Sequence, residues 1–261
     1  MRRRWLPVGP SPRALSIDVG FCTILQKIGG MRAFMSAAMC VLFANGVAHA
    51  DSIVVPAENR LNPGTRAASV PFGDFNQRWQ QFYMSTEFNQ AAGDLLRITD
   101  LRFRMDEEDL ATSFATTARG VSVSMSTTSK DFNTASTTFA ANHGPDLFVA
   151  LPTSDVVLSG TRGTSFDVVI SLPNSYTYNR KLGNLVVDVQ LSSSFAPFID
   201  ATSGHPGSTF SVAGLNMLPD GQKTSEALVT EIIYTVVPEP APIVLILIGF
   251  TVVTLFKKRI T

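Results

Sequence analysis

The chain has 261 residues, of which 45% are hydrophobic and 16% are charged, and its formal net charge is zero. The charges are unevenly distributed: residues 1–50 hold six Lys or Arg and one acid, whereas residues 51–236 hold 19 acids and 12 bases, a net charge of −7. An acidic body without a basic cluster argues against nucleic acid as a partner.

Both cysteines, Cys22 and Cys40, precede residue 51. The body therefore has no thiol, which excludes a disulfide framework, a thiolate metal site and a cysteine nucleophile within it. Its fold must rest on an apolar core, and residues 51–236 are numerous enough to bury one.

Residues 31–50 have the order of a secretory signal peptide. Met31 and Arg32 precede a mainly apolar stretch at 33–47, which ends in the small-residue site formed by Ala48 and Ala50. Cleavage after Ala50 leaves Asp51 as the first mature residue. The alternative is an internal helix, which fits the small-residue end less well. Residues 1–30 show no periodicity, and we interpret them as a disordered, mis-assigned start before a true start at residue 31.

Short apolar runs bounded by Gly, Pro and Asn predict strands throughout the body. They lie at 52–55, 78–83, 95–105, 121–125, 147–151, 156–158, 166–172, 185–191, 210–212 and 228–236. The alternation within 95–105 changes phase at Thr99 and Asp100, which predicts a β-bulge or a tight turn there. Pro152 separates two of the runs, 106–109 is read as a solvated acidic loop, and 127–144 as a long connection.

This pattern predicts an all-β fold: a single antiparallel β-sandwich or jelly-roll-like domain at 51–236. Serines and aspartates occupy alternate strand positions, as expected where one face of an antiparallel sheet contacts water.

The chain ends in three ordered elements. The first is Val237, Pro238, Glu239 and Pro240, whose prolines fix φ twice, remove two backbone donors and hold Glu239 extended. Residues 243–256 follow without a charge, and as a helix they reach ~21 Å. That is short of a ~30 Å hydrocarbon core, which alone favours a buried terminal helix.

Two features favour a transmembrane helix at 241–256 instead. The segment is apolar on every face, and it is followed by the cations Lys257, Lys258 and Arg259, typical of a cytoplasmic stop. The long side chains of the lysines can also reach the interface and shorten the gap. Residues 257–261 form a basic cytoplasmic tail in this interpretation.

Residues 237–261 resemble the PEP-CTERM sorting signal of exopolysaccharide-producing Gram-negative bacteria. This resemblance implies recognition by an exosortase, a membrane-embedded processing enzyme, after transient anchoring in the inner membrane. It also implies loss of the tail and passage to the cell surface or extracellular matrix. The body resembles a group of secreted bacterial β-sandwich domains through 78–83, 98–105, 121–129 and 178–189, which implies a fold but no activity.

The sequence supports no catalytic residue, cofactor or metal site. His143 and His205 lie in Gly/Pro loops and are expected to be solvated, and the acids at 106–109 lack the ligand spacing of a calcium loop. Ser/His/Asp catalysis would require one of these histidines beside a serine and a carboxylate.

The expected function is therefore that of an exported, non-catalytic structural or interaction protein linked to exopolysaccharide. One alternative is a carbohydrate-binding module with an exposed aromatic platform, although aromatic residues in sandwiches are more often core. The candidates for such a platform are Trp79, Tyr83, Tyr176, Tyr178 and Phe198. A hydrolase is the less supported alternative. Binding of exopolysaccharide by the body is left open.

Overall fold

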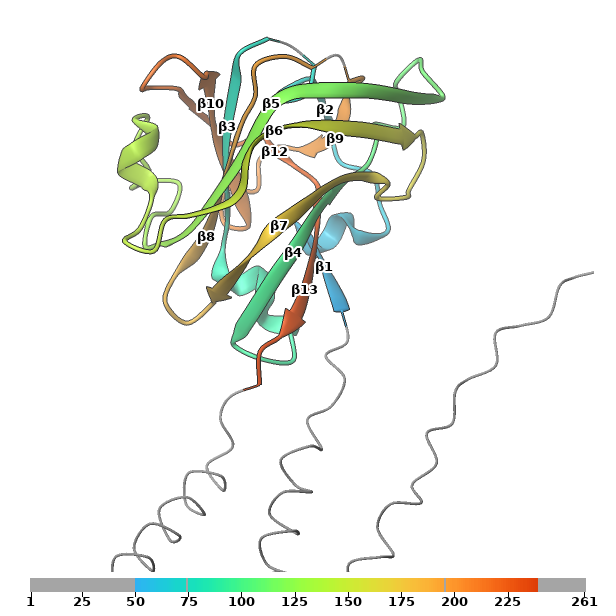
Figure 1. Ribbon diagram of the computed structural model, residues 1–261. Coiled ribbons are helices and arrows are strands. Elements are labelled where there is room, and N and C mark those ends of the chain that lie inside the picture. The colour runs from blue at the N-terminus through green and yellow to red at the C-terminus, as the bar shows by residue number, and fades with distance from the viewer. Residues whose placement is uncertain (1–49, 74, 195, 239–261) are drawn as a thin grey trace, which may run out of the picture. The chain divides into compact units, whose positions relative to one another are not determined.

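Antiparallel β-strands make up most of the domain (Figure 1). The computed structural model describes residues 50–73, 75–194 and 196–238. A four-stranded sheet has the order β1 (Ala50–Val55), β13 (Thr230–Val236), β4 (Leu95–Phe103) and β7 (Val168–Asn179). The last strand of the domain, β13, lies between β1 and β4 and pairs with both.

A second sheet has six strands and faces the first across the core. Its order is β11 (Gln222–Thr224), β10 (Thr209–Leu215), β3 (Gln77–Tyr83), β8 (Asn184–Gln190), β5 (Ser113–Thr128) and β6 (Phe148–Thr161). A small third sheet contains β12 (Ala227–Leu228), β9 (Ile199–Thr202) and β2 (Arg66–Ala68). In the part of the chain that the structure describes, three 3₁₀ helices join the strands: η3 (Ala57–Arg60), η4 (Ser85–Gln90) and η5 (Phe139–Asn142).

The main core forms where side chains of the two large sheets meet. Trp79 and Tyr83 of β3 point into it, as do Val187 and Val189 of β8, because successive side chains on a strand alternate between faces. The four-stranded sheet contributes a matching set: Leu96, Ile98, Leu101, Phe103, Val168, Ile170, Ile232 and Tyr234.

A second apolar cluster covers the outer face of the six-stranded sheet. Phe82, Val186, Phe210 and Val212 point outward from β3, β8 and β10, and Phe139 of η5 packs onto them with Ala135 and Met84. The segment at 129–147, which we call the flap, therefore shields part of a face that would otherwise be wet. Because the flap covers this part of the sheet, the polar side chains that point outward beneath it are buried as well.

The prediction of an all-β, sandwich-like fold is confirmed. The predicted bulge is confirmed too, since the pairing of β4 with β7 shifts register between Ile98 and Asp100. The signal helix expected at 31–50 and the transmembrane helix expected at 241–256 lie outside the described residues, apart from Ala50. Within the described ranges, no helix is long and apolar enough to cross a membrane.

Several local predictions were wrong. The two runs around Pro152 form one strand, β6, which tolerates a proline because it lies at the edge of its sheet. The strand predicted at 166–172 runs on to Asn179 as β7, so Tyr176 and Tyr178 lie within it. The 127–144 segment is not a plain connection, because β5 runs to Thr128 and the remainder belongs to the flap. Asp106 is buried and not solvated.

Candidate functional site

A group of buried polar side chains lies beneath the flap, and its centre is Asp188. Asp188 occupies an outward position of β8, between Val187 and Val189, which point into the main core. Its side chain is 0% exposed because the flap covers it. We call the group around it the polar cluster; its members are Arg78, Gln80, Ser126, Asn142, His143 and Asp188.

Arg78 binds Asp188 in a bidentate arrangement. Its Nε donates to Oδ1 at 3.0 Å and its Nη2 donates to Oδ2 at 2.6 Å. The arginine belongs to β3, and the register that pairs it with Gln190 of the neighbouring strand puts its fork within reach of the carboxylate. The guanidinium also lies 4.4 Å from the centre of the Phe139 ring, so it links the sheet to the flap.

His143 connects the flap to two strands. Its Nε2 lies 2.9 Å from Asp188 Oδ2, and its Nδ1 lies 2.9 Å from Ser126 Oγ of β5. Asp188 can only accept, so the network assigns the ring proton to Nε2, and the Ser126 hydroxyl then donates to Nδ1. The backbone N–H of Gly144 donates to the same Oγ at 3.3 Å.

Two amide side chains complete the polar cluster. Gln80 Nε2 donates to Asp188 Oδ2 at 3.1 Å and to the carbonyl of Phe139 at 3.2 Å. Its Oε1 accepts from Asn142 Nδ2 at 2.8 Å. Asn142 is 0% exposed and also binds Ser136 within the flap through both ends of its amide. These contacts fix the flap to the sheet from two sides.

Electrostatics favours an ionised Asp188. Burial alone would raise the pKa of this carboxyl, but the hydrogen bonds from His143 and Arg78 and the charge of Arg78 outweigh it, so the pKa is lowered. The polar cluster therefore contains a buried carboxylate that is held by the cation of Arg78 and by hydrogen-bond donors from two segments of the chain, β3 and the flap.

Ser126, His143 and Asp188 include the residue types of a hydrolytic triad, yet the serine is inaccessible. Ser126 is 0% exposed. An open hollow of about 460 Å³ lies next to the polar cluster, and its lining includes His143, Gly144, Pro145, Asp146 and Leu182 but not Ser126. A nucleophile must be reachable by its substrate. This arrangement therefore supports a structural clamp rather than acyl transfer.

Asp146 joins the wall of that hollow to the core. Its Oδ1 accepts from the backbone N–H of Thr127 at 2.9 Å, and its Oδ2 accepts from the Tyr176 hydroxyl at 2.7 Å. Burial acts to raise the pKa of Asp146, but the hydrogen bonds from Thr127 and Tyr176 lower it overall. Burial raises the pKa of Tyr176, which stays neutral.

The structure separates the other predicted candidates. The His205 side chain is 42% exposed and pairs with Glu58 at 2.9 Å, whereas the His143 side chain is 8% exposed, so the expectation of two solvated histidines was wrong for His143. Asp106 Oδ1 accepts from the N–H of Glu108. Within the ranges that the structure describes, no group of three or more His, Cys, Asp or Glu side chains could hold a metal ion.

The aromatic platform does not form from the residues proposed for it. Trp79, Tyr83, Tyr176 and Tyr178 are all buried, and Phe198 alone of the five is exposed, at 48%. The tyrosines use their hydroxyls inside the domain; Tyr83, for example, donates to Thr230 Oγ1 at 3.0 Å.

The residues assigned to processing lie mostly outside the described ranges. Ala48, Glu239, Pro240, Lys257, Lys258 and Arg259 are outside them. Ala50 is the first residue of β1, and its Cα partner is Thr235 of β13. Val237 donates its N–H to the carbonyl of Leu95 at 2.9 Å, one residue beyond the end of β13. Pro238 has no N–H with which to extend this ladder.

Comparison with known proteins adds no relative: no family model, curated protein or solved structure matches the chain. The function is therefore inferred from the side chains of the described residues and their geometry.

Proposed function

We propose that this chain is an exported protein that is processed at both ends. Its β-sandwich would then have a non-catalytic structural or interaction role at the cell surface or in the extracellular matrix. In this proposal the chain is the substrate of an exosortase, and it contacts the inner membrane transiently through the tail at 241–256.

One observation carries the proposal. The strands that begin and end the domain are antiparallel neighbours, and the pairing of Ala50 with Thr235 puts both ends of the domain at the same end of one sheet. Cleavage after Ala50 would remove one residue of β1. Loss of the tail beyond Pro238 would remove no residue of β13. The two processing sites inferred from the sequence thus flank a domain that would lose the Ala50–Thr235 pair and keep the pairing of β1 with β13 from Asp51 to Val55.

The lack of an accessible nucleophile in the polar cluster supports the non-catalytic part. Ser126 is buried, and Asp188 is bound to Arg78. The contacts of the polar cluster join β3, β5, β8 and the flap. They therefore serve to hold the flap on the sheet, as expected for a structural role.

The test of the sorting claim is a Glu239→Ala substitution in the full chain, expressed in a host with an exosortase. We expect the variant to remain in the membrane fraction, because the acidic side chain between the prolines would be the recognition element. Glu107→Ala removes an exposed acid of the body and serves as the control, with release like that of the unaltered chain. Release of the Glu239→Ala protein at the normal rate would contradict the proposal.

A further inference from the structure

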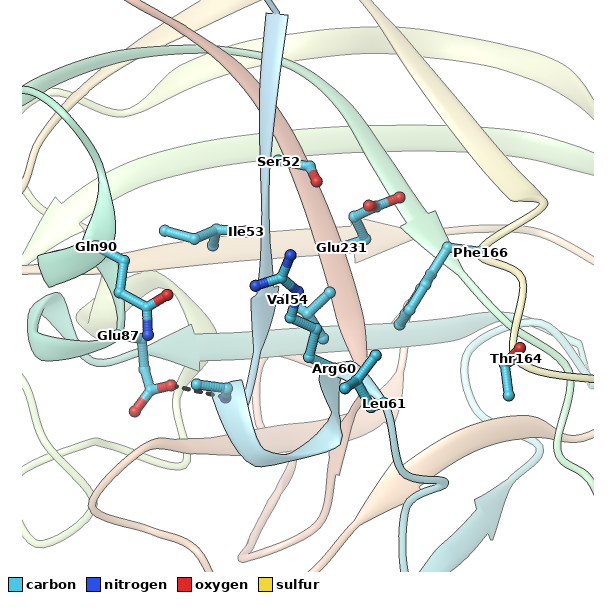
Figure 2. Close-up of a pocket in the computed structure, with 11 residues that line it drawn as sticks. Ser52, Ile53, Val54, Arg60, Leu61, Glu87, Gln90, Thr164, Phe166 and Glu231 are labelled. Atoms are coloured by element: carbon cyan, nitrogen blue, oxygen red, sulfur yellow. Dashed lines mark hydrogen bonds between the residues drawn. The ribbon is translucent and has the colours of Figure 1, made fainter.

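A second hollow lies beside β1 and β13, and its lining includes Ser52 and Val54 of β1 and Glu231 of β13 (Figure 2). It has a volume of about 380 Å³, which falls within the ~300–1,000 Å³ typical of small-ligand pockets. Strand β1 supplies Ser52 and Val54, η3 supplies Arg60, and η4 supplies Glu87 and Gln90. Four separate segments of the chain contribute to its wall.

The polar side chains of this hollow are largely unused by the fold. Arg60, Gln90, Ser52 and Thr164 have side chains without a hydrogen-bond partner among the described residues, and all four are exposed. Glu87 uses one oxygen to accept from the N–H of Ala57 at 3.1 Å. The hollow therefore offers free donors and free acceptors together.

One wall of the hollow is apolar and firmly supported. Phe166 and Leu61 both line the hollow (Figure 2). The Phe166 ring is stacked on the guanidinium of Arg104 at 4.8 Å, and Arg104 is 1% exposed and paired with Asp200. A ring held from behind by a buried ion pair is a rigid surface for an apolar ligand face.

The charges of the lining select the class of ligand. Arg60 opposes a simple cation and Glu87 opposes a simple anion, whereas the charge of Glu231 is partly offset by Arg102 at 3.8 Å. The net charge of −7 over residues 51–236 also disfavours an anion. A neutral hydroxyl group both donates and accepts, so it satisfies the carboxylates and the guanidinium at once. A sugar ring carries several such hydroxyls around an apolar face.

We propose that this hollow binds a neutral hexose unit of a glycan chain. Arg60, Gln90 and Glu231 would bind its hydroxyls, and Phe166 would contact its apolar face. The site is argued from its own geometry, whereas identifying the glycan as a component of the matrix around the cell rests on the proposed function.

The test uses the full chain, kept in solution by a polyoxyethylene detergent because glycoside detergents would compete for the site. The probes are immobilised gluco-, manno- and galacto-oligosaccharides, with oligouronates as the acidic arm. We expect at least one neutral series to bind and the oligouronates to bind more weakly. Arg60→Ala and Gln90→Ala should each weaken binding, by about tenfold or more for Arg60, which donates from a charged group.

Arg119→Ala, which removes an exposed arginine of β5 outside the hollow, is the matched control and should bind as the unaltered protein does. Circular dichroism checks that each variant is folded. The proposal is overturned by absence of binding to every neutral series, by tighter binding of the oligouronates, or by equal binding of the Arg60 and Arg119 variants. None of these results bears on export, which the Glu239→Ala experiment measures separately.

Discussion

The domain contains two buried arginine–aspartate pairs, and they differ in how completely they are bonded. Asp188 accepts from both arms of Arg78, from His143 and from Gln80. Asp200 accepts from Arg104 Nε at 2.6 Å and from the N–H of Gly64 at 2.7 Å.

The opposite pKa shifts follow from this difference. Burial would raise both carboxyl pKa values, and at Asp200 it prevails over the hydrogen bond and charge of Arg104, so that pKa is raised. At Asp188 the hydrogen bonds prevail and the pKa is lowered. Arg104 Nη1 is also buried without a partner. The two carboxylates are almost equally buried, at 0% and 1% exposure, yet their pKa values shift in opposite directions because the number of donors around each carboxylate differs.

The largest effect is expected from breaking the better-bonded pair. Asp188→Ala leaves Arg78 buried without its counter-ion and removes an acceptor from His143, so unfolding free energy should fall by about 3–5 kcal/mol. Urea unfolding measures this. Asp94→Ala, at a carboxylate that also pairs with an arginine but is 19% exposed, should change stability less. Equal losses in the two variants would contradict the clamp role of the polar cluster.

The aromatic partners of the two arginines provide the next comparison. Phe139 is 0% exposed and packs in the second apolar cluster beside Arg78, so Phe139→Ala should cost about 3 kcal/mol and loosen the flap. Phe166 is only partly buried, and Phe166→Ala should cost about 1 kcal/mol, mainly the stacking on Arg104. Hydrogen exchange of residues 129–147 should rise in the Phe139 variant alone.

Replacing both members of each arginine–aspartate pair gives a further comparison of how much the two pairs contribute to stability. Arg104→Met combined with Asp200→Asn removes an incompletely bonded ion pair and keeps an acceptor for Gly64, so stability should change by no more than about 1 kcal/mol. Arg78→Met combined with Asp188→Asn also withdraws a charged acceptor from His143 and Gln80, and should cost about 2 kcal/mol or more. A reversed order would show that hydrogen-bond number is not what distinguishes them.

The smallest expected effect is on the pH dependence of stability, to which Asp188 and Asp200 contribute with opposite signs. The folded pKa of Asp188 is below its unfolded value of ~3.9, so its contribution is present above that pH and is lost as pH falls through the folded pKa. The folded pKa of Asp200 is raised, so its ionised form costs stability at neutral pH and the cost disappears on acidification. Below about pH 5, stability should therefore fall less steeply in Asp188→Asn than in the unaltered protein, and more steeply in Asp200→Asn.

Strand alternation was sufficient to predict most of the sandwich. The runs around Val123 and Val187 became β5 and β8, and the phase slip at Thr99 became a bulge. Strands β2, β9 and β11 were missed because segments of three or four residues are too short to show a period. Strand β6 was divided at Pro152 because sequence alone does not reveal which strand lies at an edge.

The polar cluster was not predicted, and the reason is its dependence on distant parts of the chain. Arg78 and Asp188 are 110 residues apart and meet only through the pairing of β3 with β8. Their outward positions are visible in the alternation, but an outward aspartate is normally wet, and only the flap makes it buried. His143 was expected to be solvated because the sequence did not show that the loop containing it packs against a sheet.

The most direct test of the central claim, processing at both ends, is the intact mass of the protein recovered from cells and from the surrounding medium. We predict a product that begins at Asp51 and has lost the residues beyond the Pro238–Pro240 motif. Recovery of the full 28.2 kDa chain, with its tail still attached and none of it released, would contradict the account.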